Sequence, residues 1–111
     1  MPHIIVETSS DIAVSVQHLQ AAHDILMAPD ICPASAVKVR HVPLSTYVVA
    51  GQPAPFIHIT LALMPGRDPV ILRTILENLV TYFHSVHDKP VSVTAECRLL
   101  DPDTFIKYVH V

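Results

Sequence analysis

Apolar residues recur along the chain with two different periods, and the changes of period divide the sequence into strands and helices. Residues 3–7 contain an uninterrupted apolar run, Ile4, Ile5 and Val6, which predicts a strand that is buried on both faces. Capping residues at 8–11 follow, and apolar spacings of three and four residues then predict a helix over residues 12–28. The proline-containing segment 29–33 ends this helix. The expected inner stripe of the helix consists of Ile12, Val16, Leu19, His23 and Leu26.

The next predicted element is a strand over residues 37–42, in which every second side chain points to the same face. Lys38 and Arg40 therefore share one face of this strand. Residues 45–50 predict a short edge hairpin, and the turn at 51–55 follows it.

The second half of the chain carries the same three elements in the same order. Residues 56–64 form the strongest predicted strand of the sequence. Asp68 as a cap and Pro69 as the first helical residue begin a helix that ends near residue 87. The alternating segment 91–97 predicts the last strand.

The starts of corresponding elements in the two halves differ by 53, 56 and 54 residues. This repetition predicts an α+β fold of two similar β-α-β halves. They form one mixed four-stranded sheet with both helices on one face, plus the short extra hairpin. One domain, residues 1–111, is expected at this length. The opposite face of the sheet is left uncovered. Because this face carries apolar residues, we expect it to pack against other copies of the chain.

Composition narrows the possible functions. The chain is 50% hydrophobic with a mean hydropathy of +0.43, which supports the expectation that other subunits cover part of it. A net charge of −3 without a basic run does not predict a nucleic-acid partner. Neither a membrane span nor a signal peptide is expected. Cys32 and Cys97 are far apart and form no CxxC motif, which favours a reduced, cytoplasmic setting.

The first candidate for chemistry is Pro2, which follows the initiator Met1 directly. If Met1 is removed, the nitrogen of Pro2 becomes a secondary amine that can accept a proton and return it. Terminal amines have a pKa of about 7.7–8.0, and an apolar pocket or a nearby cation lowers that pKa. A base with a pKa near neutrality suits proton-transfer catalysis. Most Met-Pro starts have no such role, so this hypothesis needs support from the rest of the chain.

That support comes from five segments that together resemble the tautomerase superfamily, and within it the 5-carboxymethyl-2-hydroxymuconate isomerases. They are residues 1–7 (MPHIIVE), 31–33 (ICP), 38–40 (KVR), 56–61 (FIHITL) and 66–67 (GR). The resemblance covers nearly the whole chain, and the first helix and the tail match worst. It implies a homotrimer of β-α-β repeats with one site per subunit near a subunit boundary. It also implies a catalytic proline at position 2, without a cofactor or a metal, which moves a proton along a conjugated dienol to give the ketone.

The resemblance further implies that cationic residues hold the substrate carboxylates, and these fall on Lys38, Arg40 and Arg67. Lys38 departs from the family pattern, because an arginine is expected there. Arginine binds a carboxylate with two parallel hydrogen bonds, whereas lysine acts as a point charge, so the departure bears on the identity of the substrate. Arg67 precedes the second helix, whose amino terminus favours anions. Without the resemblance, all three cations fit a solvated surface equally well.

Other chemistries have weaker support in the sequence. His84 and His87 are three residues apart on a helix, but only Asp88 is available as a third ligand, so no metal site is predicted. His3 and His58 are expected to be structural and to be held by backbone partners. Glu96 is expected to be exposed.

Two functions therefore stay open. The first is a cofactor-independent isomerase that acts on a small unsaturated enol or keto acid, with Pro2 as the base. The second is a non-catalytic oligomeric domain of the same fold that binds a small acid or a protein. A retained Met1 would make the nitrogen of Pro2 an amide, so the mass of the intact protein distinguishes the two.

Overall fold

The computed structural model describes residues 1–110, which contain four strands and two α-helices in the expected order. The strands are β1 (His3–Ser9), β2 (Lys38–Leu44), β3 (Phe56–Leu63) and β4 (Ser92–Leu99). The helices are α1 (Val16–Met27) and α2 (Pro69–Ser85), and two short 3-10 helices are η1 (Ala34–Ala36) and η2 (Pro102–Thr104). Among the described residues, no helix combines the length and the apolar character that a membrane span requires.

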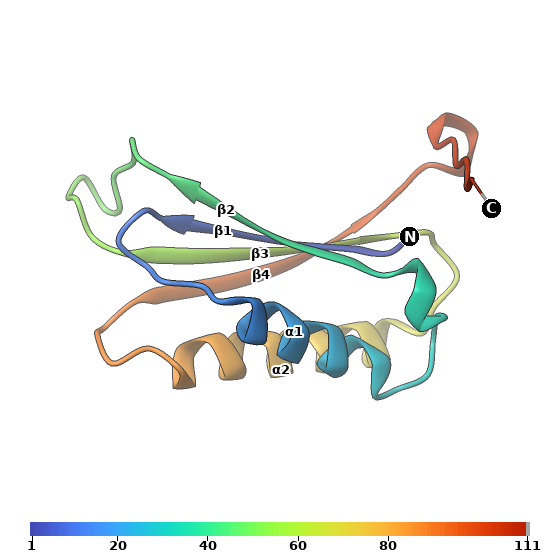
Figure 1. Ribbon diagram of the computed structural model, residues 1–111, viewed down its shortest axis with the longest axis horizontal. Coiled ribbons are helices and arrows are strands. Elements are labelled where there is room, and N and C mark those ends of the chain that lie inside the picture. The colour runs from blue at the N-terminus through green and yellow to red at the C-terminus, as the bar shows by residue number, and fades with distance from the viewer. Residues whose placement is uncertain (111) are drawn as a thin grey trace.

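The strands form one mixed sheet in the order β2-β1-β3-β4. β1 and β2 are parallel, as are β3 and β4, and the two pairs join through the antiparallel contact between β1 and β3. Both helices cover the same face of the sheet (Figure 1). Helix α1 packs beside β2, and α2 packs on β3 and β4. The predicted α+β fold of two β-α-β halves is confirmed.

Helix α1 begins later than expected, at Val16. Ser15 caps it: the Ser15 hydroxyl accepts the His18 backbone N–H at 3.3 Å, and the Ser15 N–H donates to His18 Nδ1 at 3.1 Å. The side chain of Val16 is 81% exposed and does not belong to the inner stripe. Helix α2 begins at Pro69 as predicted, and the Asp68 carboxylate accepts the Val70 N–H at 2.9 Å. The two helices thus start 53 residues apart (16 and 69), as do β1 and β3 (3 and 56).

The hydrophobic core lies between the sheet and the two helices. Alternate residues of β1 and β3 point into it and meet the apolar stripes of the helices. Burial of each such side chain favours the fold by about 1.5–3 kcal/mol relative to exposure. The largest fully buried members are Ile4, Leu26, Ile57, Ile59, Leu61, Leu63, Ile75, Leu79 and Phe83.

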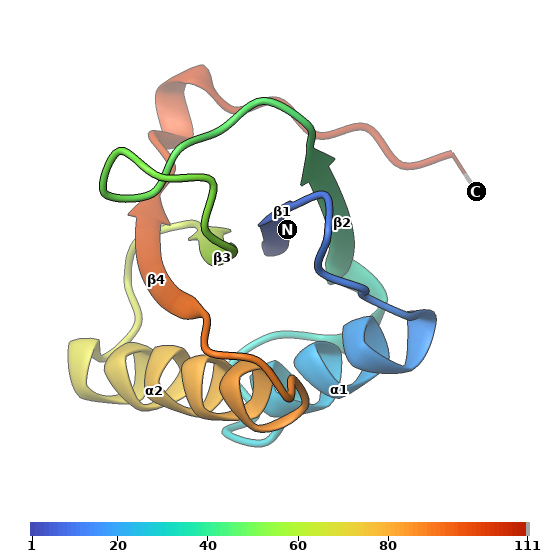
Figure 2. The same ribbon diagram turned by 90° about the vertical axis from the view of Figure 1, so that its left-hand side faces the viewer.

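The opposite face of the sheet has no helix over it (Figure 2). Most of its residues are polar, but strand register also places the apolar residues Ile5, Val42, Leu44, Phe56 and Ala62 on it. The apolar run 4–6 suggested burial on both faces, yet only Ile4 and Val6 are fully buried. Strand register places Ile5, which lies between them, on this uncovered face, next to polar residues of the other strands. Its polar members are His3, Glu7, Ser9, Lys38, Arg40, His58, Thr60, Ser92, Thr94, Glu96 and Arg98.

Hydrogen bonds between side chains connect the part of this face that lies on β3 and β4. His58 Nδ1 is 2.7 Å from Thr94 Oγ1, and His58 Nε2 is 2.6 Å from Glu96 Oε2. Arg98 Nε donates to Glu96 Oε1 at 3.0 Å. The hydrogen bonds from Arg98 and His58 lower the pKa of Glu96. His58 is therefore held by side chains and not by the backbone, and Glu96 is paired and only partly exposed, contrary to expectation.

The hairpin expected at residues 45–50 is reduced to a tight turn with one antiparallel bridge. Val49 and Gln52 exchange backbone hydrogen bonds of 2.7 and 3.0 Å. Ala50 and Gly51 both have positive φ angles (52° and 75°), as in a two-residue hairpin turn. The single bridge at this turn does not extend into paired strands.

Candidate active site

The predicted site residues gather at one end of the sheet, where the amino terminus lies beside the start of β2. Pro2 precedes β1, and its carbonyl oxygen accepts the Lys38 backbone N–H at 3.1 Å. The side chain of Pro2 is fully buried. The turn from β3 into α2, which carries Arg67, reaches the same end of the molecule (Figure 1). Parallel pairing of β1 with β2 therefore places Pro2 and Lys38 together, as the function hypothesis requires.

The terminal amine of this chain is that of Met1, and it shares an acceptor with a lysine. The Met1 nitrogen donates to the Ala36 carbonyl at 2.7 Å, and Lys38 Nζ donates to the same oxygen at 3.0 Å. Burial lowers the pKa of the terminal amine, and the neighbouring Lys38 and the charge of Lys107 lower it further. An amine at this end of the sheet is thus easier to deprotonate than one in water.

Arg40 lies two residues beyond Lys38 on the same face of β2, and its side chain turns toward His3. Arg40 Nη1 is 2.9 Å from His3 Nδ1. Because a guanidinium group can only donate, Nδ1 is the acceptor and carries no proton. Burial lowers the pKa of His3, and the charges of Arg40, the terminal amine and Lys38 add to that effect. His3 is therefore neutral and held by an arginine, where the sequence suggested a backbone partner.

Arg67 occupies the turn between β3 and α2 and is half-buried. Its Nη1 donates to the Met64 carbonyl at 3.0 Å, and the preceding Gly66 has a φ of +114°, which a side chain would disfavour. Burial raises the pKa of the Cys32 thiol, while Arg67 and the terminal amine oppose that rise. Cys32 therefore lies within electrostatic reach of both groups. Sequence reasoning did not place Cys32 at the site, although it belongs to one of the matching segments.

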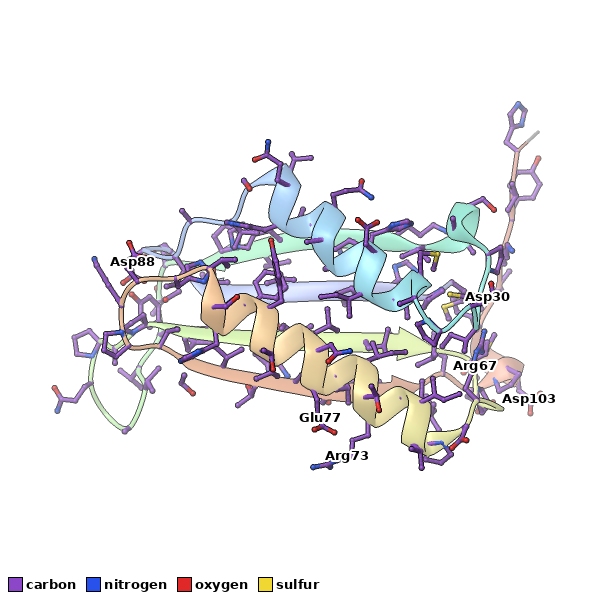
Figure 3. All side chains as sticks on the ribbon, turned by 90° about the horizontal axis from the view of Figure 1, so that it is seen from below. Asp30, Arg67, Arg73, Glu77, Asp88 and Asp103 are labelled. Carbon is purple, nitrogen blue, oxygen red and sulfur yellow. The ribbon has the colours of Figure 1, made fainter. Side chains whose placement is uncertain are left out.

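A hollow of about 320 Å³ opens beside Arg67, between α2 and β4. Figure 3 shows Arg67 at the end of the molecule where Asp30 also lies, with Asp88 at the opposite end. Pro2, Lys38 and Arg40 lie outside this hollow. The structure thus brings together Pro2 and Lys38, places Arg67 at the same end, and engages Arg40 with His3. The hollow is lined by Gly66, Arg67, Pro69, Leu72, Arg73, Leu76, Cys97 and Leu99.

Comparison with known proteins identifies the family. Residues 2–99 match the sequence model of the family 5-carboxymethyl-2-hydroxymuconate isomerase. The chain belongs to this family. It is therefore an isomerase of the tautomerase type, and the predicted class of enzyme is confirmed. A search among curated proteins finds none that matches the chain.

Solved structures show the same fold. A 5-carboxymethyl-2-hydroxymuconate isomerase from Deinococcus radiodurans R1 is 20% identical, with a TM-score of 0.81 over 98% of this chain and 90% of that one. A 5-carboxymethyl-2-hydroxymuconate delta-isomerase is 16% identical, with a TM-score of 0.80 over 98% and 89%. A fused 4-OT, described as a symmetric trimer, is 18% identical, with a TM-score of 0.73 over 91% and 88%.

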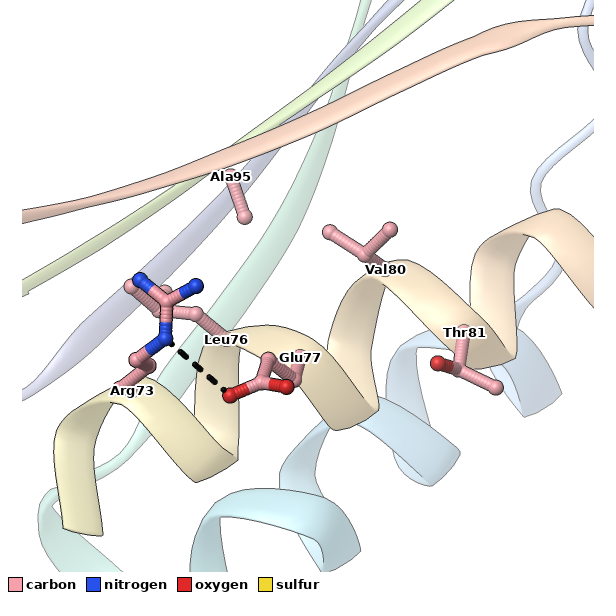
Figure 4. Close-up of a pocket in the computed structure, with 6 residues that line it drawn as sticks. All are labelled: Arg73, Leu76, Glu77, Val80, Thr81 and Ala95. Atoms are coloured by element: carbon pink, nitrogen blue, oxygen red, sulfur yellow. Dashed lines mark ion pairs between the residues drawn. The ribbon is translucent and has the colours of Figure 1, made fainter. Parts of the chain in front are cut away.

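The isomerase has a second hollow of about 330 Å³ between α2 and the edge strand β4 (Figure 4). Its most polar feature is the ion pair between Arg73 Nε and Glu77 Oε1, which are 3.4 Å apart and exposed. Such a pair on a helix contributes about 0.3–0.5 kcal/mol. Leu76, Val80 and Ala95 supply apolar lining, and none of the predicted site residues borders this hollow.

His87, one of the two histidines considered as metal ligands, has other contacts. His87 Nδ1 is 2.7 Å from the Phe83 carbonyl oxygen, and its Nε2 is 3.2 Å from that of Ala13. Within residues 1–110, the isomerase shows no group of three or more His, Cys, Asp or Glu side chains arranged to hold a metal ion.

Proposed function

We propose that the isomerase converts a small unsaturated enol acid into its keto form, with the nitrogen of Pro2 as the base once Met1 has been removed. The base takes the proton of the enol hydroxyl group and returns a proton to the far carbon of the conjugated system. Only O–H, C–H and π bonds change, so the step needs no oxidant or reductant. The observation that carries this proposal is the position of Pro2 beside the start of β2, where its carbonyl oxygen accepts the Lys38 backbone N–H at 3.1 Å. A cation near an amine lowers the pKa of that amine, which favours its action as a base.

The substrate class follows from the charges around that amine. Lys38 and Arg40 on β2 and Arg67 before α2 are proposed to bind the carboxylates of the acid. A cation near the carbonyl end also stabilises the negative charge that develops on oxygen when the hydroxyl proton leaves. Three cations at one end of a chain whose net charge is −3 favour an acid with two carboxylates over a neutral ketone.

The assembly is proposed to be a homotrimer of one-domain subunits, residues 1–111, with the site near a subunit boundary. The described trimer of a protein with this fold supports this proposal. The strands β2 and β4 are both open edges, so each subunit offers two sites for sheet contacts with neighbours. Cys32 and Cys97 are both free, in keeping with the proposed reduced, cytoplasmic setting.

The test compares two forms of the same protein. One form lacks Met1, as shown by the mass of the intact chain, and the other retains it and so has an amide at Pro2. Ketonisation of 2-hydroxymuconate, followed by its ultraviolet absorbance, should be fast with the first form and near the uncatalysed rate with the second. Equal rates for the two forms would exclude the proline base. Binding of the acid without turnover by either form would favour the non-catalytic domain.

A further inference from the structure

The hollow of about 320 Å³ between α2 and β4 has an apolar lining that comes from both elements. Leu72 and Leu76 lie four residues apart and so share one face of α2. Cys97 and Leu99 are alternate residues of β4 and share the face of the sheet that the helices cover. The volume lies near the lower end of the range for small-molecule sites, which is about 300–1,000 Å³. The hollow therefore has the size and the lining of a site for a small apolar group.

The charge of the hollow is positive. Its two charged lining residues are Arg67 and Arg73, and no carboxylate belongs to the lining within residues 1–110. Arg67 is half-buried and uses Nη1 for the Met64 carbonyl, so the other donors of its guanidinium group remain for a ligand. Arg73 extends from α2 beside Leu76 (Figure 4), and its Nε is 3.4 Å from Glu77 Oε1, which borders the neighbouring hollow.

We propose that this hollow binds an acid with an apolar body, an arylalkanoate or a similar monocarboxylate. Its carboxylate lies against the two arginines, and its hydrocarbon part lies on the leucines. An inorganic anion would leave the leucines in contact with water, and a neutral hydrocarbon would leave the arginines without a partner. Since Pro2 does not border the hollow, binding requires no proton transfer and goes beyond the proposed function.

The hollow has a consequence for the reaction because Arg67 is also one of the cations proposed to hold the substrate. An acid in the hollow engages this guanidinium group and competes with one carboxylate of the substrate. The acid should therefore raise KM for 2-hydroxymuconate and leave kcat unchanged. This consequence, unlike the binding itself, rests on the proposed function.

The binding experiment uses 3-phenylpropionate, which is saturated and so cannot tautomerise. Two matched probes each lack one half of it: 3-phenylpropionamide has no charge, and propionate has no ring. Binding to the assembled protein is followed by nuclear magnetic resonance titration. We expect each matched probe to bind about tenfold more weakly, because one loses a charge-assisted hydrogen bond and the other loses the burial of the ring.

Three variants test the lining. Arg73→Gln should weaken binding of 3-phenylpropionate about two- to fivefold, as expected for an exposed cation. Leu99→Glu introduces a carboxylate beside the arginines and should abolish binding, and since Leu99 is 58% exposed, its replacement removes little burial. Lys89→Gln is the matched control for lost positive charge and should bind like the wild type. Lys89 follows Asp88, which Figure 3 places at the end away from Arg67.

The two cysteines give a second measurement within one protein. Cys97 borders the hollow and Cys32 does not, and both are free and half-buried. Burial raises the pKa of both thiols, so alkylation by iodoacetamide is measured at a pH of about 8.5. Saturating 3-phenylpropionate should slow the alkylation of Cys97 several-fold and leave that of Cys32 unchanged.

Several results would overturn the inference. Equal affinities for the acid and its amide would exclude the arginines, and equal affinities for the acid and propionate would exclude the apolar lining. Protection of both cysteines or of neither would place the probe outside the hollow. If Leu99→Glu has a changed melting temperature or assembly mass, Arg73→Gln decides, and wild-type binding by Arg73→Gln would end the proposal. Titration of the form that retains Met1 keeps this test apart from the proline base. Binding there with an unchanged KM in the active form would support the hollow and contradict the proposed role of Arg67.

Discussion

The two halves of the isomerase, β1-α1-β2 and β3-α2-β4, share a fold but differ in chemistry. Each is a pair of parallel strands joined by a helix, and each begins directly after a proline, Pro2 or Pro55. These prolines are 53 residues apart, the same distance as between the starts of β1 and β3. The nitrogen of Pro55 is an amide in every form of the chain, whereas that of Pro2 becomes an amine when Met1 is lost. The fold therefore supplies the position, and the chain end supplies the base.

Charge separates the halves as well. The starts of β2 and β4 differ by 54 residues, so Lys38 and Arg40 correspond to Ser92 and Thr94, which are neutral. The second half contributes Arg67, from the turn before its helix. The amine, the strand cations and this turn meet at one end because β1 lies between β2 and β3 in the sheet. The two halves thus have the same fold, but the first supplies the amine and two cations of the site and the second supplies one cation.

The largest difference between the two halves is expected when each proline is replaced separately. Pro2→Ala keeps a terminal amine but loses its fixed direction and its secondary-amine basicity, so we expect kcat/KM to fall by about 10²- to 10⁴-fold. Pro55→Ala should leave the rate close to that of the wild type, because Pro55 has no proton to exchange. Steady-state kinetics on protein without Met1 measure both. A Pro2→Ala enzyme with the wild-type rate at every pH would end the proline mechanism.

The next largest effect on the kinetics is expected when Arg67, the cation that the second half contributes to the site, is replaced. A charge-assisted hydrogen bond contributes about 1.5–3 kcal/mol, which corresponds to about tenfold or more in affinity. Arg67→Ala should therefore raise KM at least tenfold and lower kcat less, since the cation binds both ground state and transition state. Lys89→Ala is the control for lost positive charge.

Thermal melting separates binding from structure in the Arg67→Ala variant. The side chain makes one hydrogen bond to the Met64 carbonyl, so its loss should hardly change Tm or the assembly mass. A trimer that dissociates would instead assign Arg67 to the subunit interface. Unchanged kinetics and unchanged stability would make it a solvated loop charge.

Replacement of Lys38 by arginine is expected to change KM less than Arg67→Ala does, and in the opposite direction. Lys38→Arg introduces the bidentate group that the family pattern has at this position, so KM for 2-hydroxymuconate should fall, by up to about tenfold. Lys38→Gln is the matched variant and should raise KM. It should also move the acid limb of kcat/KM to higher pH, because a nearby ammonium group lowers the pKa of an amine, as Lys38 does for the amine of Met1. If arginine and glutamine have the same effect on KM, Lys38 does not contact a carboxylate.

The sequence predicted the fold well because each half repeats the same periods and helix caps. It misplaced the start of α1, since Ile12 continues the helical spacing although it belongs to a turn in which its N–H donates to the Ser9 carbonyl at 3.1 Å. The sequence also did not show which residues of a strand line the uncovered face, because a run such as 4–6 does not reveal which alternate residues face the helices until the register is known. The placement of Lys38 near the amino terminus followed from the resemblance to the family, since the spacing of the residues alone fitted a solvated strand equally well.

The smallest expected effect concerns a polar pair on the helix-covered face of the first half. Thr8 Oγ1 is 2.8 Å from His41 Nε2, whereas the corresponding residues of the second half are the apolar Leu61 and Ala95, 53 and 54 positions later. Burial lowers the pKa of His41. Between its ordinary value near 6.5 and the lowered folded value, the unfolded chain therefore binds more protons than the folded one. The contribution of neutral His41 to stability is complete above the ordinary value and is lost as the pH falls through the folded value.

The double variant Thr8→Leu with His41→Ala gives the first half the residues of the second and should weaken this dependence on pH. We expect the wild-type Tm to fall by a few degrees more than the variant Tm between pH 7.5 and pH 5, in keeping with small changes in the stability of a domain of this size. His3, whose pKa is also lowered, is present in both proteins, so its contribution cancels in the difference. If the two proteins lose the same number of degrees, the sensitivity to acid arises elsewhere and the Thr8–His41 pair serves packing alone.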